Sequence, residues 1–553
     1  MNDSPQTTTS ALSPFQHRIF RSVWIATLAS SFGGMIQGVG AAWDMVALGA
    51  SPQMITLVQA SITLPIVMLA LVAGALADAY DRRKIMLAAQ ILMLVVSSAL
   101  AVAAYMHLAT PWLLLLFTFL IGCGAALNAP AWQASVGAMV PRHDVASAIT
   151  LNSMGFNLAR SVGPAIGGLI VAFAGASAAF AINAVSYLGL ICVLMRWKTV
   201  PERRMLPRER FGSAILSGIR YVAMSPSINT TLIRGLVTGV GASAASALLP
   251  LIARDVIGGG PEIYGLLLGG FGVGAVAGAF GAHRLRIAYS NEWVVRGALL
   301  LSAAGLLISA FSTWMVVTMG AMALCGLGWV TIVSILNATV QLSAPRWVVA
   351  RALSLYQMAT FSGMAGGAWL WGHITEQASL STALTIAAAV QIGCIVLGRW
   401  FPLVETESMN LDLQGFNEPA TIVPVQGRTG PVIITIEYRI APEDIFEFLG
   451  VMAERRQIRR MNGARRWSLM RDLADPELWI ERYHSPTWTE YLRHNHRFTQ
   501  DDALVTARVR ALHRSPDAPI VRRLLERQTG FPPESAEDAP GLAPPMTDQS
   551  RLS

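Results

Sequence analysis

Three charged side chains lie inside long apolar runs of the sequence. They are Asp44, Arg160 and Arg234. A charge near the middle of a membrane helix costs about 3 kcal/mol or more unless it is paired or hydrated. These residues therefore indicate a pathway for a polar substrate or a proton. The alternative is that Arg234 and Asp44 reach the two edges of the membrane and play only structural parts.

Uncharged polar residues accompany two of these charges. Gln37 precedes Asp44 by seven residues and shares its helix face. Asn157 and Asn152 lie about one and two turns before Arg160. We expect the two arginines to hold an anionic or polar group of a substrate. We expect the aspartate to carry a proton or to pair with an arginine.

The same apolar run that contains Arg160 continues with the sequence GPAIGG. Pro164 removes one helix hydrogen bond, and Gly163, Gly167 and Gly168 allow another helix to approach closely. The segment therefore predicts a hinge at these four residues. Close packing of two static helices is the alternative.

The elements that position these residues are membrane-spanning helices. The chain has 553 residues, of which 53% are hydrophobic and 13% charged, and its mean hydropathy is +0.49; soluble chains carry roughly 25% charge. The 57 residues between Lys84 and Arg142 carry no formal charge, which is enough for two helices of about 20 residues and a turn. We expect an all-α membrane fold of twelve transmembrane helices. Six lie in residues 19–200 and six in residues 226–403, joined by a cytoplasmic loop at residues 201–225.

Basic residues indicate the orientation of these spans. Lysine and arginine gather in alternate connections, and the remaining connections have only Arg254, next to Asp255. Because basic loops stay on the cytoplasmic side during insertion, we expect both termini, including a tail at residues 1–18, to be cytoplasmic. This topology accounts for the net charge of +8 and removes it as an argument for nucleic-acid binding.

The loop after the second span, GALADAYDRRK, resembles the signature G-x-L-a-D-r-x-G-R-[KR] of the major facilitator superfamily. Gly74, Asp78 and Arg82 keep their places, whereas Asp81 stands where the signature has its second glycine. An aspartate at a helix end accepts charge-assisted hydrogen bonds from a nearby arginine or a helix N-terminus. The three matching residues therefore predict a conformational latch, unless this is simply a basic loop with incidental acids.

Further segments resemble one branch of this superfamily. The GPAIGG run is similar to the signature of its antiporters, and LGASP, ALNAPAWQA and YGLLLG are similar to the branch that contains the enterobactin exporter and the transmembrane secretion effector proteins. The resemblance implies proton-driven efflux of a siderophore, antibiotic or similar amphipathic metabolite across the bacterial inner membrane by alternating access, without a cofactor. The expected partners are that small molecule, protons and the lipid bilayer. Antiporter relatives often place an arginine in the fourth span, which is uncharged here, so proton coupling rests on the resemblance.

Two alternatives remain open from the sequence. One is an uptake carrier of the same fold, and the other is a membrane-anchored enzyme whose cytoplasmic module performs oxidative chemistry. Residues 431–513 contain no recognisable nucleophile or cofactor motif, which favours a transporter with no catalytic residues.

The last 150 residues differ in composition, since residues 404–553 carry 22 of the 33 acidic side chains. After a linker at residues 404–430, the pattern predicts a strand at 432–439, a helix at 442–460, strands at 467–471 and 479–483, a helix at 487–496 and a final strand or helix at 503–512. The first of these helices should bury a stripe of Phe446, Leu449 and Ala453.

Residues 431–513 resemble the ferredoxin-like modules of antibiotic-biosynthesis monooxygenases, an α+β fold. These modules usually pair through their sheets, which implies a homodimer. Residues 514–553 are expected to be disordered.

Two clusters in this module invite a binding role. His494 and His496 lie two residues apart, so they diverge on a helix, and no Cys or carboxylate spacing completes a metal set; we expect solvated or edge-packed histidines and no metal. An arginine-rich run could touch anionic lipid or form a solvated helix face; it consists of Arg455, Arg456, Arg459, Arg460, Arg465 and Arg466.

Overall fold

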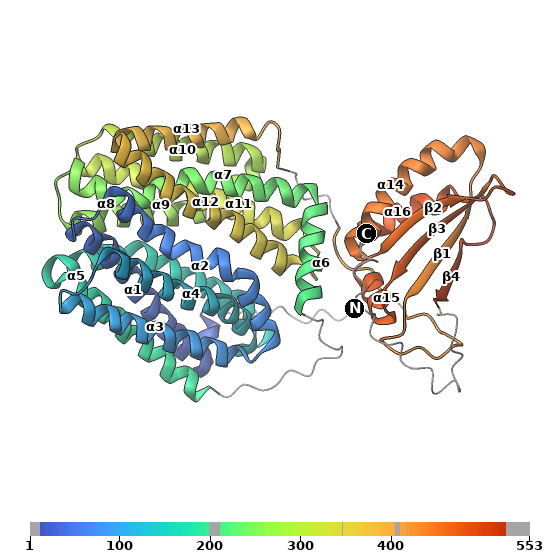
Figure 1. Ribbon diagram of the computed structural model, residues 1–553, viewed down its shortest axis with the longest axis horizontal. Coiled ribbons are helices and arrows are strands. Elements are labelled where there is room, and N and C mark those ends of the chain that lie inside the picture. Colours follow the sequence, from blue (N-terminus) through green and yellow to red (C-terminus); the bar gives the residue numbers. More distant parts are fainter. Residues whose placement is uncertain (1–11, 198–210, 346, 404–409, 417, 527–553) are drawn as a thin grey trace. The chain divides into compact units, whose positions relative to one another are not determined.

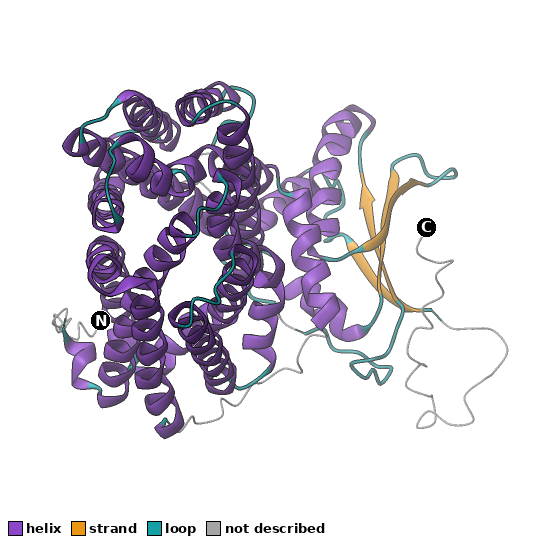
Figure 2. Ribbon diagram, turned by 60° about the vertical axis from the view of Figure 1, so that its left-hand side comes forward, coloured by secondary structure: helices purple, strands orange, loops and turns teal. Residues whose placement is uncertain are grey.

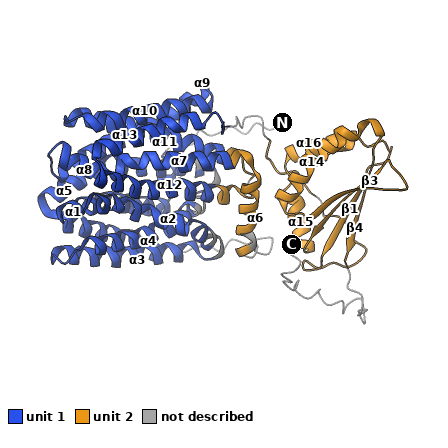
Figure 3. Cartoon of the chain, turned by 45° about the horizontal axis from the view of Figure 1, so that its top comes forward, with its two compact units in different colours: residues 1–211, 229–340, 353–405 blue, residues 212–228, 341–352, 406–553 orange. Residues whose placement is uncertain are grey.

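The computed structural model describes residues 12–197, 211–345, 347–403, 410–416 and 418–526. It divides the chain into two compact units (Figure 3). Unit 1 comprises residues 1–211, 229–340 and 353–405, and unit 2 comprises residues 212–228, 341–352 and 406–553. The expected tail at 1–18, central loop at 201–225, linker at 404–430 and disordered end at 514–553 lie partly outside the described residues.

The described part of unit 1 is built from helices (Figure 2). In chain order the helices that precede the C-terminal domain are η1 Ser13–Gln16, α1 Arg18–Ala47, α2 Pro52–Ala79, α3 Arg82–Tyr105, α4 Pro111–Met139, η2 Arg142–Asp144, α5 Val145–Arg196, α6 Phe211–Met224, α7 Pro226–Ala247, α8 Leu249–Leu251, η3 Ile252–Val256, α9 Pro261–Ala288, α10 Asn291–Phe311, α11 Met315–Leu342, α12 Val349–Gln377 and α13 Leu380–Leu397.

Ten helices in the described part of the chain are long and apolar enough to cross a membrane. The predicted helical membrane architecture is therefore confirmed. The 52-residue α5 contains one residue outside helical geometry, Gly175, with φ 77° and ψ 172°, a conformation that glycine adopts without steric cost. This turn falls between two of the spans expected from the sequence. The 29-residue α12 is not among the ten, so the number twelve stays a prediction.

Several membrane helices begin at a capping side chain. Ser51 and Thr110 accept hydrogen bonds from backbone amides three residues later, and each precedes a proline at the first helical position. Ser379 caps α13 in the same way. A hydroxyl at the N-cap satisfies an orphan amide, and proline at the next position loses no hydrogen bond. Short polar motifs thus define where these long apolar helices start.

Unit 1 contains two groups of helices that follow the two parts of the sequence, α1–α5 and α7–α13 (Figure 1). One large buried apolar cluster includes residues of both groups, among them Met45 of α1, Leu251 of α8 and Trp371 of α12. At the start of α2, a Cβ added at Gly372 of α12 would lie 2.8 Å from the Cα atom of Gln53. The two groups are therefore joined where α2 begins.

The C-terminal domain of unit 2 is a four-stranded sheet with helices packed on it. Its elements are β1 Val432–Arg439, η5 Pro442–Asp444, α14 Ile445–Asn462, β2 Arg465–Arg471, β3 Leu478–Ser485, α15 Trp488–His496, α16 Gln500–Ala511 and β4 Ile520–Leu525. The strand order is β2-β3-β1-β4, and every neighbouring pair is antiparallel. Helices α14 and α16 cover one face of the sheet (Figure 1). The sequence pattern predicts the first three strands and the helices at 442–460 and 487–496 close to their observed positions. Of residues 503–512, expected to form a strand or a helix, residues 503–511 lie in α16.

Two sequence expectations for this domain need correction. Residues 520–525 belong to the region expected to be disordered, but they form β4 and pair with β1. Their mostly exposed positions give no alternating pattern, which is why the strand is hard to predict. The expected apolar stripe on α14 is also wrong: Phe446 is 93% and Leu449 is 43% exposed, whereas Phe448 and Met452 are buried.

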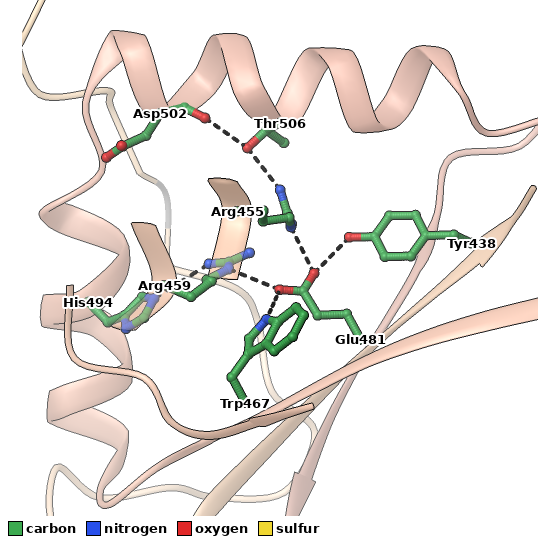
Figure 4. Close-up of polar contacts among 8 residues, drawn as sticks. All are labelled: Tyr438, Arg455, Arg459, Trp467, Glu481, His494, Asp502 and Thr506. Atoms are coloured by element: carbon green, nitrogen blue, oxygen red, sulfur yellow. Dashed lines mark hydrogen bonds and ion pairs between the residues drawn. The ribbon is translucent and has the colours of Figure 1, made fainter. Parts of the chain in front are cut away.

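The buried face of α14 carries two arginines that meet a carboxylate of the sheet. Glu481 of β3 is fully buried, and its Oε2 accepts hydrogen bonds of 2.8 Å from Arg455 Nε and from the Tyr438 hydroxyl (Figure 4). Its Oε1 accepts a 3.0 Å bond from Trp467 Nε1 and lies 3.4 Å from Arg459 Nε. A buried carboxylate is tolerated only when it is fully paired in this way. This ionic cluster therefore fixes α14 on the sheet.

We predict that Glu481→Gln lowers the free energy of unfolding of unit 2 by about 3–5 kcal/mol, because Arg455 and Arg459 lose their buried counter-charge. Glu454→Gln is the matched control. It removes an exposed pair with Arg508 and should cost less than about 1 kcal/mol. Proteolysis of the purified full-length chain across a urea series measures both. Equal resistance of the two variants would contradict a stabilising role for the cluster.

The same cluster predicts the acid sensitivity of unit 2. Burial alone would raise the pKa of Glu481, but Arg455 and Arg459 lower that pKa from 4.5 to about 2. A carboxylate with a depressed pKa stabilises the fold at pH values above its ordinary pKa. The contribution of Glu481 should therefore persist at neutral pH and be lost as the pH falls from about 4.5 to about 2. The pH dependence of that proteolysis should be weaker in the Glu481→Gln variant.

Candidate functional site

The residues expected to line a pathway are distributed over several places in unit 1. Gln37 is almost fully buried between α1, α3 and α5. Its Oε1 accepts hydrogen bonds from Ser97 Oγ, at 3.1 Å, and from Asn183 Nδ2. Asn183 also donates to the Tyr187 hydroxyl at 3.0 Å. Interhelical bonds of this kind hold helices together in an apolar environment, so Gln37 packs the first group of helices.

Arg160 of α5 lies against α9. Its guanidinium carbon stands 5.6 Å from the centre of the Phe271 ring, within the range of a cation–π contact. None of the ion pairs formed by the described residues includes Arg160. A guanidinium has five donors and keeps its charge, so this side chain retains the capacity to bind an anionic group. Because α5 and α9 belong to different groups of helices, Arg160 lies at their boundary.

The two asparagines of α5 differ in their contacts. Asn157 lies three residues before Arg160, on the same helix face, and is half-buried. Asn152 accepts a 3.2 Å hydrogen bond through Oδ1 from Trp132 Nε1 of α4. Asn157 therefore accompanies the arginine, whereas Asn152 joins α4 to α5.

Asp44 lies near the end of α1. Its Oδ2 atom is buried and has no hydrogen-bond partner among the described residues. The adjacent Trp43 stacks on Tyr264 of α9, with ring centres 6.3 Å apart. A carboxylate oxygen in this position has acceptor capacity that a proton or a donor group of a substrate would satisfy. Asp44 also lies close to the boundary between the two groups of helices.

Arg234 of α7 occupies a different environment. It is 2% exposed and forms an ion pair with Glu292 of α10, which in turn accepts a 2.9 Å hydrogen bond from Arg296. The carbonyl of Phe401, just beyond α13, lies 3.4 Å from Arg234 Nη1. This three-residue ionic cluster connects α7 to the beginning of α10 and to the segment just after α13. Sequence reasoning missed Glu292, although its i, i+4 spacing to Arg296 at a helix start was visible.

The GPAIGG segment forms the closest helix crossing near Arg160. The helix is continuous through Pro164, and Gly163 and Gly167 face α1, where an added Cβ would lie 2.7 Å from Met35 Cβ and 3.0 Å from Ile36 Cα, respectively. Gly168 faces α9 instead, and a Cβ there would lie 2.6 Å from the Pro261 carbonyl oxygen. The hinge expected at these residues stays a prediction; what the geometry provides is close packing on two sides of α5.

The α9 side of this crossing also consists of glycines. A Cβ at Gly265 would lie 2.6 Å from the Pro164 carbonyl oxygen, and one at Gly272 would lie 2.6 Å from Ser161 Cα. Small residues let membrane helices approach until their backbones touch. The spacing of seven residues places both glycines on one face of α9. This spacing is visible in the sequence and could have predicted a close helix contact.

The loop between α2 and α3 is organised by residues next to the expected latch. Gly74 and Asp78 lie in the last two turns of α2 and Arg82 opens α3; the side chain of Asp78 lies outside the described residues. Asp81 is the N-cap of α3 and accepts a 3.0 Å hydrogen bond from the Arg83 amide. This explains why aspartate can replace the glycine of the superfamily signature.

Arg83 adds a contact that the sequence did not reveal. Its Nε and Nη2 donate to the carbonyls of Leu194 and Met195 at 2.6 and 2.8 Å. These carbonyls belong to the last turn of α5, where a helix has orphan acceptors and partial negative charge. Arg83 therefore fastens the end of α5 to the beginning of α3.

The histidines of unit 2 do not form a metal site among the described residues. His494, expected to be solvated or edge-packed, is instead buried and stacked on Tyr483. Burial and the nearby Arg459 and Arg497 lower the pKa of His494 well below 6.5. His494 is therefore a neutral core residue, whereas His496 is exposed.

We predict that Gly168→Ala impairs transport and lowers stability, because the new Cβ would meet backbone atoms of α9 that cannot rotate away. Gly38→Ala in α1 is the matched control, since a Cβ there meets no atom within 4 Å. The thermal stability of both purified variants and their transport rates measure the effect. If both variants behave like the unmodified chain, the crossing of α5 and α9 is looser than described.

Comparisons with known proteins identify the family to which this chain belongs. A transporter of Bacillus subtilis (strain 168), named "Uncharacterized MFS-type transporter YfiS", is 25% identical over 364 residues, which cover 63% of this chain and 85% of that protein. The enterobactin exporter EntS of Escherichia coli O1:K1 / APEC is 29% identical over 346 residues, covering 61% of this chain and 80% of the exporter.

Solved structures show the same fold at low sequence identity. A bacterial homologue of the human lysosomal transporter Spinster, crystallised facing inward, has a TM-score of 0.56 and 12% identity, covering 70% of this chain and 95% of that one. The nucleoside transporter NupG has a TM-score of 0.56 and 12% identity, covering 70% of this chain and 100% of that one. The model of the transmembrane secretion effector family matches residues 9–529. The chain therefore belongs to the transmembrane secretion effector family of major facilitator transporters.

Proposed function

We propose that this transporter exports an amphipathic small molecule, such as a siderophore or an antibiotic, by alternating access. The observation that carries the proposal is Arg160, which has no acidic partner among the described residues and lies where α5 meets α9. A charge retained at the boundary of two helix groups is suited to a substrate that passes between them. The enterobactin exporters among the relatives support export of an acidic siderophore-like molecule.

The helix count supports two halves of six spans. Treating α5 as two spans separated by Gly175 and adding α12 to the ten apolar helices brings the number to twelve. The first half then ends with α5 and the second begins with α7. Basic residues in alternate connections support cytoplasmic termini in a bacterial inner membrane.

The buried cluster shared by both halves supports one state of the transport cycle. It lies where α2 begins at Pro52, which is the outer end in this orientation. We infer a conformation closed to the outside. In the opposite state these contacts separate while the crossing of α5 and α9 pivots.

Proton coupling is part of the same proposal. Asp44 is the acidic residue that sequence and geometry both favour as the proton site, because its Oδ2 is buried without a partner in the described part of the chain.

We further propose that the C-terminal domain is a ferredoxin-like module, as its strand order and antiparallel pairing suggest, and that it joins two copies of the transporter through its sheet.

Export predicts accumulation of substrate in everted membrane vesicles. A growth screen of a deletion strain against siderophores and antibiotics selects the substrate, with enterobactin as the first probe. Under a proton gradient across everted vesicles, the labelled substrate should accumulate inside, and a protonophore should abolish the accumulation. Depletion from preloaded vesicles would indicate an uptake carrier and refute export.

We expect Arg160→Gln to raise the apparent KM for an anionic substrate about tenfold or more, because one charge-assisted hydrogen bond is lost. Arg160→Lys should restore part of the affinity. Arg254→Gln, which breaks a partly exposed ion pair with Asp255 in η3, is the control and should leave transport unchanged. An unaltered KM in Arg160→Gln would remove this residue from the substrate pathway.

A further inference from the structure

A basic cavity lies within unit 2, apart from the residues assigned to transport. Its volume is about 400 Å³, which is in the range of small-molecule sites. Arginines of three elements line it, together with one tryptophan: Arg220 of α6, Arg456 and Arg460 of α14, and Arg465, Arg466 and Trp467 of β2. No acidic residue lines it among the described residues.

The helix period separates the arginines of α14 into two pairs. Arg455 and Arg459 are buried and bind Glu481. Arg456 and Arg460 follow each of them by one position and are exposed. Residues four apart lie on one helix face, so the second pair forms its own basic strip beside the buried one. The arginine-rich run is therefore neither one solvated face nor one ionic cluster.

The start of β2 brings two more arginines to the same cavity. Gly463 ends α14 with φ 123°, and Arg465 and Arg466 follow at once. Arg466 has φ 49°, and the pairing of β2 with β3 shifts between Arg465 and Ser468, as in a β-bulge. Such irregularities redirect side chains at the edges of sheets, here next to the basic strip of α14.

Four of the lining arginines, those of α14 and β2, have no acidic partner among the described residues. None of the ion pairs formed by the described residues includes Arg460, Arg465 or Arg466. Arg456 contacts the ring of Trp467, 5.8 Å from its centre. Like charges gathered in one cavity repel each other, and a bound polyanion relieves that repulsion.

The wall of the cavity is anchored to the core. Trp467 lines the cavity and donates its Nε1 hydrogen to the buried Glu481. The same carboxylate pairs with Arg455 and Arg459, which fixes the backbone of α14 next to Arg456 and Arg460. Donors that are positioned before binding lose little entropy when a ligand arrives.

We propose that this cavity binds an anion that carries more than one phosphate group. Guanidinium groups match phosphate oxygens with paired hydrogen bonds, and a single phosphate would leave part of the charge of the four arginines of α14 and β2 unbalanced. Two sources share this chemistry: a free diphosphate and the two-phosphate headgroup of cardiolipin. The site does not depend on the direction of transport or on its substrate.

The test uses the full-length chain in phosphatidylcholine nanodiscs. In one arm, inorganic pyrophosphate is titrated by calorimetry. In the other, the nanodiscs contain cardiolipin, and the cardiolipin retained after exchange into detergent is quantified. The cavity variant combines Arg460→Gln with Arg466→Gln. The control combines Arg428→Gln with Arg510→Gln, which removes the same charge from exposed positions of the domain that do not line the cavity.

We expect the cavity variant to bind about a hundredfold more weakly than the control, since each arginine contributes about tenfold through a charge-assisted hydrogen bond. A loss confined to pyrophosphate identifies a free anion, and a loss confined to cardiolipin identifies the lipid. Thermal unfolding without ligand checks that both variants fold. Equal binding by the two variants in both arms, or binding by neither the unmodified chain nor the variants, overturns the proposal.

Discussion

The close approach of α5 and α9 is the constraint on which the helical unit depends. At Gly168 and Gly265 the two backbones come so near that neither position has room for a side chain. In a soluble protein the hydrophobic effect brings helices together, but it does not act between helices surrounded by lipid. Close van der Waals packing must therefore supply the attraction between membrane helices. The crossing also determines what lies beside it. Arg160 contacts Phe271 across the same interface, so a charged side chain is held next to the point where the two halves touch.

Unit 2 contains many arginines in a small domain, and it places them in two different environments. Glu481 neutralises two of them inside the core, and Tyr438 and Trp467 complete the coordination of its oxygens. The next residue in each case faces outward and remains unneutralised. A single helix thereby separates its positive charge into a part that holds the fold together and a part that is available to a ligand.

Much of the architecture follows from the sequence because the bilayer imposes strong patterns. Long uncharged runs and basic connections were sufficient to predict a helical membrane protein, and the resemblance of the GALADAYDRRK loop to a known signature indicated the correct superfamily. The β-alternation at residues 432–439 and the apolar and polar periods after it were likewise sufficient for most of the C-terminal domain. These signals are local, and each can be read within about twenty residues.

What could not be predicted depends on contacts between distant residues. The pairing of Arg234 with Glu292, of Arg83 with the end of α5, and of Arg455 with Glu481 joins positions from 26 to 111 residues apart. The apolar pattern of α14 predicts a buried stripe through Phe446, because it assigns arginines to solvent. The buried face of α14 nevertheless contains Arg455 and Arg459. A buried ionic cluster is invisible to hydrophobic periodicity.

The attachment of Arg83 to the final carbonyls of α5 affects how motion passes along the chain. The first group of helices is fastened up to its last helical turn, so in the alternating-access mechanism that we propose it would tilt as one rigid body. A displacement of the beginning of α3 would therefore be transmitted to the end of α5 rather than absorbed by fraying of its last turn.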